Sequence, residues 1–579
     1  MDGFVAFGTH DRQRRACLPR ARIRHYVADP RDGARGWADT VGWSRVPEVN
    51  LSQVENLMTL LKARPLPRDV RRLHTSRENL QSTLYVSVRI LRSLRDHAAA
   101  YRAAYVPRDE RLRIQRELAP LVRAAYGDDA MLTGRRLALG DLEDEIRRHA
   151  SNSVPVMALS RIVAECLDKE YGDHFWEQIR RYYNLHESTQ GRPVKSQRLT
   201  IDDPVPVCAS IFGGTGPDRG TNPRNLPRWR SPERIGHFVL APAEVKQFEV
   251  HLNFELTKEL NALQPAGQRV AVVSPSDHSD DFAWDTDEHK TRYWNVHPRG
   301  KSDKPRGHPR ARSAADYRSL LQRGVDTAIA NNTRLVVLPE LSMTPKEAEN
   351  LADYWQQQQP SQQDAGERRV PTILVAGSYH EPGESTHNVA TIVGRSARFP
   401  LYKATPHVYR PRRTGQAPEH PPTSSTEQGT DESDDEERFE IVESIIQRDE
   451  PEVTVFCGRH VTLAVVVCVD FLMDALRDLL RNLDVGMVVV PSMTDKTNVF
   501  RRLIDGHVAT TQGVVLLANG VQSRDEESRV TVGIPKDPYT ISVTTDGKLA
   551  AQAGPGVAII DLDNPDASEW ISLKPGKAS

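Results

Sequence analysis

The chain has few cysteines. Its 579 residues include five, which are Cys17, Cys166, Cys208, Cys457 and Cys468. Their number is odd and they lie far apart, which argues against a disulfide framework, and no pair has the short spacing of zinc ligands. We therefore expect neither a disulfide-stabilised secreted domain nor a bound metal.

Long apolar runs are also missing. The longest, at 463–469 and 485–490, are far shorter than the roughly 20 residues that a membrane-spanning helix needs. The first twenty residues carry Arg12, Arg14 and Arg15 but no apolar stretch that could serve as a signal-peptide core. We expect a cytoplasmic protein that does not contact a membrane.

The chain has almost no net charge, since its formal charge at pH 7 is -1. Residues 1–200 nevertheless hold about ten more basic than acidic side chains. This excess leaves a nucleic-acid partner open, but an arginine-rich solvated helical surface explains it as well, and we favour that interpretation. The preference for arginine over lysine hints at a GC-rich bacterial genome.

The N-terminal third has helical periodicity. Between about residues 50 and 185 apolar residues recur three or four positions apart, as in Leu80, Leu84, Val88 and Leu91. We assign residues 1–190 to a mostly α-helical module of unknown role. A connection at 191–265 comes next, which contains a proline- and glycine-rich linker and a short helical segment around 241–263.

Residues 266–579 have a different pattern. Short β-branched runs alternate with amphipathic segments, which is typical of a layered α/β domain. An acidic stretch at about 411–438 cannot bury an apolar face, and we expect it to be a disordered surface insertion. The runs that we predict to be strands lie at 270–274, 334–338, 372–376, 389–393, 461–469, 485–490 and 514–518.

Three reactive side chains lie at the ends of such runs. Glu340 follows Pro339 after the run at 334–338, Lys403 follows the run at 389–393, and Cys468 lies near the end of the run at 461–469. In α/β folds a side chain at a strand end leaves the packed sheet and reaches its rim. A thiol, a carboxylate and an ammonium supply the nucleophile, the base and the positive charge that amide or nitrile hydrolysis needs.

In their order and context, the three residues resemble the nitrilase, or carbon-nitrogen hydrolase, superfamily. Tyr402 stands beside the lysine and Asp470 stands two positions after the cysteine, as in that family. The likeness covers about residues 268–565. It implies a four-layer α-β-β-α sandwich, preceded here by the helical module, and a homodimer or larger homo-oligomer. It also implies hydrolysis of a small-molecule amide or nitrile with no cofactor, and we favour an amide because most branches of the family act on amides.

The resemblance also assigns roles. Glu340 would act as general base, Lys403 would stabilise the tetrahedral intermediate and favour the thiolate, and Cys468 would form an acyl-enzyme. A valine replaces the aromatic residue that usually follows the cysteine, but its backbone amide stays available for the oxyanion. The substrate and oxyanion contacts that we predict are Val469, Asp470, His407, Asn388, Ser492 and Met493. A second active-site acid is also implied, and Glu419, Glu440 and Glu443 are its candidates.

Other motifs are weaker. The tetrapeptide Tyr126-Gly-Asp-Asp129 matches some polymerase active sites, but its flanks have helical character, so we interpret it as a turn after a helix. Gly213-Gly-Thr-Gly216 lacks the lysine and serine of a phosphate-binding loop. A different hypothesis is a catalytically silent scaffold whose basic module binds a protein or nucleic acid in bacterial stress or phage defence.

Overall fold

The computed structural model describes most of the chain from residue 76 onward. The described ranges, some with short internal gaps, are 76–98, 106–126, 132–151, 156–185, 196–207, 234–263, 269–298, 314–358, 373–409, 441–521, 530–535, 541–543 and 554–574, together with a few single positions near 54–59 and 101. The acidic stretch at 411–438, Glu419, Glu440, the loop at 213–216 and most of the tetrapeptide at 126–129 lie outside the described residues.

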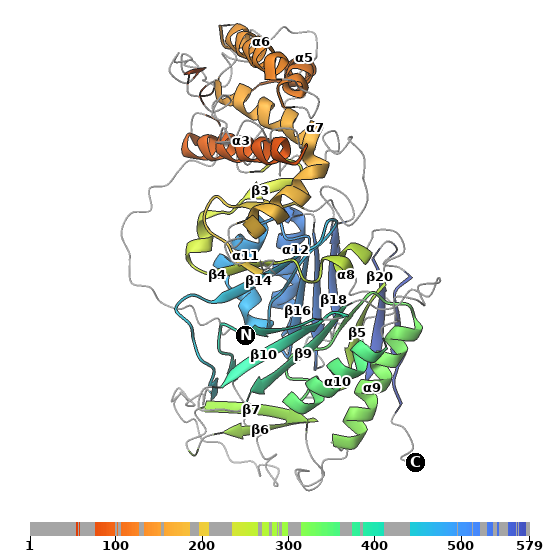
Figure 1. The fold of residues 1–579 in the computed structure, drawn as a ribbon. Coiled ribbons are helices and arrows are strands. Elements are labelled where there is room, and N and C mark those ends of the chain that lie inside the picture. The colour runs from red at the N-terminus through yellow and green to blue at the C-terminus, as the bar shows by residue number, and fades with distance from the viewer. Residues whose placement is uncertain are drawn as a thin grey trace, which may run out of the picture. The chain divides into compact units, whose positions relative to one another are not determined.

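The first described elements are helices: α3 (Ser76–Asp96), α5 (Arg108–Tyr126), α6 (Leu132–Ser151) and α7 (Val156–Leu185). Helix α7 packs against α3 and α5, and α5 packs against α6 (Figure 1). The apolar stripe that predicted helix α3 is buried, as shown by Leu84, Val88 and Leu91. None of the helices that the structure describes is both long enough and apolar enough to cross a bilayer.

A small sheet joins these helices to the C-terminal part of the chain. It consists of β2 (Pro204–Pro206) and β3 (Phe238–Leu240) and contacts α7 and α3. The Tyr183 hydroxyl donates to the Pro204 carbonyl at 2.8 Å. The Asp168 carboxylate accepts the backbone N–H groups of Gly236 and His237, each at 3.1 Å. Buried polar contacts therefore fasten α7 to the small sheet.

The segment expected to be helical around 241–263 contains a strand. A 3-10 turn, η6 (Ala243–Lys246), precedes β4 (Glu249–Asn253), and a short helix, α8 (Thr257–Ala262), comes after it. Apolar residues at 245, 248 and 252 imitate helical spacing. The alternating burial of Val250 and Leu252 shows why the strand forms: both side chains enter the core when β4 pairs in parallel with β14 (Glu452–Cys457).

Two large sheets make up the rest of the fold. The first has the order β1-β4-β14-β15-β16-β17-β18-β19, and its central pairs β15/β16 and β16/β17 are parallel. The second has the order β11-β10-β9-β8-β5-β20-β21. The prediction of a mixed α/β fold is confirmed. The first sheet's remaining strands are β1 (Ser196–Arg198), β15 (Thr462–Val465), β16 (Met487–Ser492), β17 (Val514–Asn519), β18 (Val530–Pro535) and β19 (Ile541–Val543).

The second sheet holds most of the strands that the sequence predicted between 269 and 402. Each of them lies within a residue or two of its expected start, because continuous β-branched runs mark buried strands well. Strand β11 had no separate prediction. The strands are β5 (Arg269–Ser274), β8 (Leu335–Val337), β9 (Ile373–Glu381), β10 (His387–Val393), β11 (Arg398–Tyr402), β20 (Gly556–Asp561) and β21 (Glu569–Ser572).

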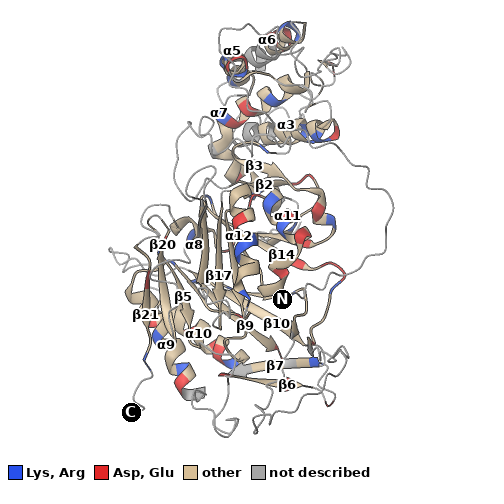
Figure 2. Cartoon of the chain, turned by 180° about the vertical axis from the view of Figure 1, so that it is seen from behind, with Lys and Arg blue, Asp and Glu red and all other residues tan. Residues whose placement is uncertain are grey.

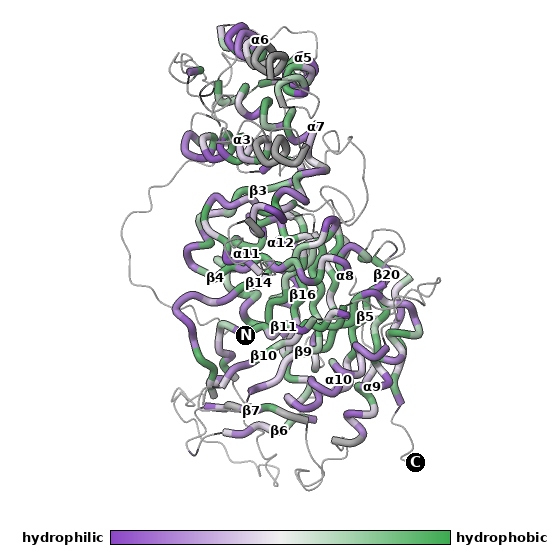
Figure 3. The backbone as a smooth tube through the Cα atoms, in the orientation of Figure 1, coloured by the Kyte–Doolittle hydropathy of each residue, from purple (hydrophilic) through white to green (hydrophobic). Residues whose placement is uncertain are grey.

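The two faces of the second sheet have different partners. On β5, Val270 and Val272 belong to a cluster that includes the first sheet, whereas Ala271 and Val273 belong to a cluster with α9 (Ala314–Ala330) and α10 (Pro345–Gln357). Both faces are therefore apolar, as the hydropathy of the central strands shows (Figure 3). The first sheet carries α12 (Thr497–Thr511), which contacts α11 (Asp474–Asn482).

A four-stranded sheet completes the described structure. Its order is β12 (Val408–Tyr409), β13 (Ile441–Glu443), β7 (Arg292–Pro298) and β6 (Phe282–Thr286). The sequence predicted none of these strands. Segments more than a hundred positions apart thus meet in this sheet. Charged side chains lie mainly on helices and loops, and the central strands carry few of them (Figure 2).

Candidate active site

The three predicted catalytic side chains meet in one buried place. Lys403 Nζ donates to Glu340 Oε1 at 2.8 Å, and both side chains are nearly inaccessible, at 1% and 3% exposure. Two consecutive residues at the end of β16 connect the cysteine to this pair. The Ser492 hydroxyl donates to Cys468 Sγ at 3.2 Å, and the Met493 backbone N–H donates to Glu340 Oε2 at 3.1 Å.

Strand ends bring these residues together. Glu340 follows β8, Lys403 follows β11, and Cys468 opens a 3-10 turn, η10 (Cys468–Leu472), just after β15. Two backbone positions are left-handed, since φ is +47° at Cys468 and +54° at Leu341. Non-glycine residues in this region are uncommon, and they cluster at sites where the chain turns sharply to present a side chain.

Glu443 is the second acid of the site. Its Oε2 accepts Lys403 Nζ at 2.6 Å and the His407 backbone N–H at 2.8 Å, and its Oε1 accepts Asn388 Nδ2 and His380 Nε2, each at 2.9 Å. Sequence reasoning left Glu443 as one of three candidates. The structure places it against the lysine, and the other two lie outside the described residues.

The two acids differ in how many hydrogen bonds they accept. A carboxylate offers about four lone-pair positions. Glu443 accepts four donors, so it has no position left. Among the residues that the structure describes, Glu340 accepts three: Lys403 and Asn388 at Oε1 and Met493 at Oε2. Glu340 Oε2 therefore retains room for a proton donor.

The charges in this group support one another. Burial would lower the pKa of Lys403, but the carboxylates of Glu340 and Glu443 outweigh burial and raise that pKa well above its usual value. Burial likewise acts to raise the pKa of Glu443, but the Lys403 ammonium and the His380 hydrogen bond hold the pKa well below its usual range. Lys403 is thus a permanent cation and Glu443 a permanent anion at neutral pH.

The structure corrects the expectation of a thiolate. Burial raises the pKa of the Cys468 thiol, the Glu340 carboxylate raises it further, and the Lys403 ammonium and the Ser492 hydroxyl only partly oppose them. The ammonium is occupied by two carboxylates, so it stabilises a thiolate weakly. A thiol with a raised pKa is neutral at pH 7, so a base would have to remove its proton before sulfur could attack a substrate.

Asp470 holds the loop that follows Lys403. Its two oxygens accept the backbone N–H groups of Ala404 and Thr405, at 2.8 and 2.7 Å. Burial raises the pKa of Asp470 to about 6, and the hydrogen bonds from Ala404 and Thr405 oppose that rise. The residue predicted to contact substrate therefore anchors the chain directly after Lys403.

The remaining predicted contacts surround the same group. Asn388 is fully buried and bridges the two acids. His407 is half-buried and reaches Glu443 through its backbone. Val469 is half-buried near the start of η10. The first backbone N–H groups of such a turn form no hydrogen bond within it, so the Val469 amide can donate elsewhere.

An apolar wall borders the acids, and sequence reasoning missed it. Leu341 and Met493, which flank the site, pack in one cluster with buried side chains from the hairpin of β6 and β7. No local pattern marks these residues, because they come from five separate segments of the chain. The cluster consists of Phe282, Tyr293, Val296, Tyr317, Leu341, Met493 and Val521, with Trp284 packed against it.

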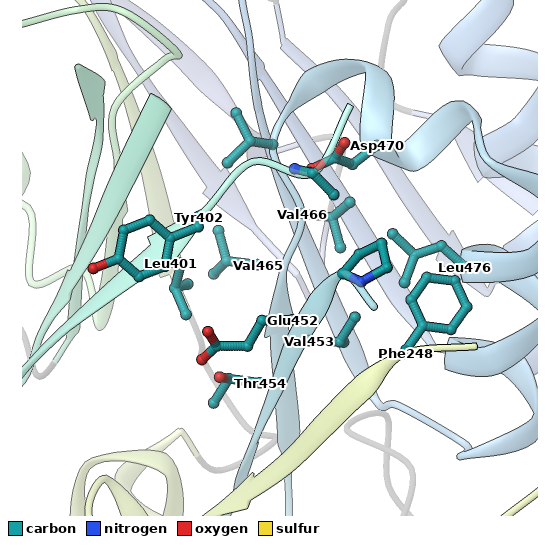
Figure 4. A pocket seen from close by; sticks show the side chains of 13 residues that line it. Phe248, Leu401, Tyr402, Glu452, Val453, Thr454, Val465, Val466, Asp470 and Leu476 are labelled. Carbon is teal, nitrogen blue, oxygen red and sulfur yellow. The ribbon is translucent and has the colours of Figure 1, made fainter. Parts of the chain in front are cut away.

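A separate pocket lies behind the lysine loop (Figure 4). Tyr402, Ala404 and Asp470 line it together with strands β14 and β15. Most of its remaining wall is apolar, and its lining includes none of Glu340, Lys403, Glu443 and Cys468. It therefore borders the backbone that positions the lysine but is distinct from the candidate active site.

One group of metal-type ligands occurs in the described residues, far along the chain from this site. Glu117, Glu145 and His149 lie on α5 and α6. His149 Nε2 is 3.0 Å from Glu117 and 3.2 Å from Glu145, and Arg113 pairs with Glu117 at 2.7 Å. Ion pairs account for these positions, so the cluster by itself assigns no metal.

No family model and no curated protein matches the chain. Among solved structures, an amidase from Nesterenkonia sp. is 14% identical with a TM-score of 0.30, over 51% of this chain and 91% of that chain. A mutant of the Nesterenkonia AN1 amidase from the nitrilase superfamily is 15% identical with a TM-score of 0.29, over 52% and 92%.

A glutamine-dependent NAD+ synthetase from Acinetobacter baumannii is 12% identical with a TM-score of 0.29, over 54% of this chain and 48% of that chain. Identities and TM-scores this low assign neither a family nor an activity. Any functional conclusion must come from the site itself.

Proposed function

We propose that this protein hydrolyses non-peptide carbon–nitrogen bonds, in amides rather than nitriles, as a nitrilase-superfamily enzyme with a four-layer sandwich fold. One observation carries the proposal: a buried lysine is held between two carboxylates beside a buried cysteine, and only one of the carboxylates retains room for a proton. Amide hydrolysis needs a nucleophile, a base and a fixed positive charge, and these residues supply them.

Acylation begins with the neutral thiol. As Cys468 Sγ attacks the carbonyl carbon, its proton passes to Glu340, whose Oε2 has the open position. Lys403 and the Val469 amide stabilise the negative oxygen of the tetrahedral intermediate. Glu340 then returns the proton to the leaving nitrogen, the carbon–nitrogen bond breaks, and ammonia or an amine departs from the acyl-cysteine.

Deacylation repeats these roles with water. Glu340 takes a proton from the attacking water, and Lys403 again stabilises the oxyanion. The carbon–sulfur bond then breaks, the proton returns to sulfur, and the carboxylic acid leaves. Each proton taken by Glu340 is thus given back, and the cycle uses only side chains and water, so it requires no cofactor.

The preference for amides and the proposal of a homodimer or larger homo-oligomer rest on the resemblance noted in the sequence. The cytoplasmic location is proposed from the sequence composition alone. For the basic surface, the structure favours the solvated interpretation. Arg113, Arg147 and Arg148 on α5 and α6 each form ion pairs with a glutamate of the same helix. Such pairs place an opposite charge beside each of these arginines.

Labelling and turnover test the proposal together. Iodoacetamide at neutral pH, followed by peptide mass spectrometry, should modify Cys468 faster than Cys166, because Glu340 can take the Cys468 proton as sulfur attacks. Burial and the Glu165 and Glu170 carboxylates raise the pKa of the buried Cys166 thiol to about 12, with Lys169 opposing them. Ammonia release from a panel of small amides should accompany this reactivity, and Cys468→Ala should abolish it.

The two acids should behave differently. Glu340→Gln removes the base and should slow acyl transfer by about 100- to 10,000-fold. Glu443→Gln keeps the base and should impair the reaction by loosening Lys403. If Cys468 is no more reactive than Cys166 and no amide yields ammonia, the scaffold hypothesis replaces the enzyme.

A further inference from the structure

His380 forms two hydrogen bonds inside the site, and the proposed mechanism uses neither. It lies near the end of β9 with a side chain that is 1% exposed. Its Nδ1 accepts the backbone N–H of Val296, on β7, at 3.1 Å. Its Nε2 lies 2.9 Å from Glu443 Oε1, on β13.

These two partners define the protonation of the ring. A backbone N–H can only donate, so Nδ1 must be the unprotonated nitrogen. A carboxylate can only accept, so Nε2 must carry the proton. His380 is therefore a neutral imidazole with its proton on Nε2, and the backbone of β7 selects that tautomer.

The ring connects three strands that meet only in the folded protein. Strand β13 pairs in parallel with β7, with Glu443 opposite Tyr293, and the Tyr293 ring packs edge-to-face on His380 at 6.0 Å between centroids. Backbone pairing places the Cα of Glu443, and the imidazole then orients its carboxylate. That carboxylate holds Lys403 Nζ at 2.6 Å.

We propose that His380 is a positioning residue for the hydrolytic site: its Nε2–H orients the Glu443 carboxylate, which in turn holds the Lys403 ammonium beside Cys468. The catalytic consequence rests on the proposed function, whereas the hydrogen-bond arrangement does not. The titratable groups that face Glu443 from the packed elements are Lys403, Glu340, His380 and Tyr293.

Two substitutions separate the two hydrogen bonds of the ring. In His380→Gln the amide N–H can stand where Nε2–H stood, so Glu443 keeps its donor while Val296 loses its acceptor. In His380→Asn the shorter side chain can accept from Val296 but cannot reach Glu443. His387→Ala is the matched control, because His387 begins the neighbouring strand β10, is only half-buried, and packs on Tyr402 rather than on Glu443.

Acyl transfer is measured on the full chain with 4-nitrophenyl acetate, and stability is measured by thermal unfolding. His380→Asn should lose about 100-fold in acyl transfer, since a displacement near 1 Å has effects of that size. His380→Gln should recover most of the rate although it unfolds at a lower temperature, and His387→Ala should match wild type in rate.

A merely structural role predicts no such recovery. The rates would then follow stability, with His380→Gln as impaired as His380→Asn, and that result would overturn the proposal. If wild type transfers no acyl group and Cys468 is unreactive, the proposed function fails by itself. Nitrogen NMR of histidine-labelled protein, with the His380→Gln spectrum for assignment, then decides the inference. A protonated Nε2 at neutral pH supports it, and a protonated Nδ1 refutes it.

Discussion

At the residue scale, Glu340 and Glu443 share one ammonium yet have different capacities. Glu443 is saturated by four donors and its pKa lies well below the usual range, so it stays ionised and immobile. Glu340 accepts three donors from the part of the chain that the structure describes, so one acceptor position remains on Oε2. This difference in donors favours Glu340 as the base of the proposed reaction, which the residue type alone cannot do.

Asp470 should give the proposed acyl transfer an acid limb near pH 6. Burial raises its pKa to about 6, and protonation leaves one of the Ala404 and Thr405 amides without its acceptor. The loop after Lys403 then loosens, so acyl transfer should fall as pH drops through 6. Asp470→Asn should be slow at every pH and show no limb there, and a limb that persists in this variant would disprove the assignment.

The pH dependence of stability should run opposite to that of acyl transfer, because protonation of Asp470 stabilises the folded protein. The folded protein holds the Asp470 proton more tightly than the unfolded chain, in which an aspartate has a pKa of about 4. The contribution of this carboxyl is therefore complete below pH 4 and lost as pH rises through 6. The free energy of unfolding of wild type relative to Asp470→Asn, from urea titrations, should decline between pH 4 and 6 and level off above.

At the scale of elements, strand ends and tight turns place the reactive groups. Pro339 ends β8 one residue before Glu340, and the left-handed Leu341 turns the chain away. Gly377 on β9 makes this turn possible. Its φ is +67°, and a Cβ there would lie 2.2 Å from the Pro339 carbonyl oxygen and 2.5 Å from Ser342 Oγ. The strand beside Glu340 must therefore carry glycine at this position.

Two glycine substitutions should have opposite effects. Gly377→Ala should destabilise the protein by more than about 2 kcal/mol, because it combines backbone strain with a clash against fixed backbone, and it should also slow acyl transfer by displacing Glu340. Gly506→Ala is the control. Gly506 is exposed within α12 with nothing within 4 Å of an added Cβ, so alanine should stabilise by about 1 kcal/mol. Chemical denaturation of both variants measures these changes, and equal effects would contradict the packing argument.

At the scale of the whole molecule, the larger sheet is built from segments on both sides of residue 266. Strands β1 and β4 pair with each other, and β4 covers the edge of β14. Val250 and Leu252 of β4 are fully buried. The segment that the sequence presented as a connection thus supplies part of the sheet and of its core.

Truncation should reveal this dependence. The full chain keeps β1 and β4 and is the control. A chain that begins at residue 266 lacks β4, which exposes the edge of β14 and the apolar surface that Val250 and Leu252 cover, so it should aggregate. Size-exclusion chromatography of both chains checks the prediction. A monodisperse shorter chain would show that β4 is dispensable.

The sequence by itself determined the strands with continuous β-branched runs, the helical periodicity of the N-terminal third, and Glu340, Lys403 and Cys468 as candidates. These features are local, since they depend on spacing along the chain and on the chemistry of single residues. Only the tertiary structure decided that β4 is a strand, that Glu443 binds Lys403, that burial raises the pKa of the Cys468 thiol, and that His380 contacts Glu443 and Asp470 the loop after Lys403. Each of these depends on burial and on partners brought from distant segments, and spacing along the chain carries no record of either.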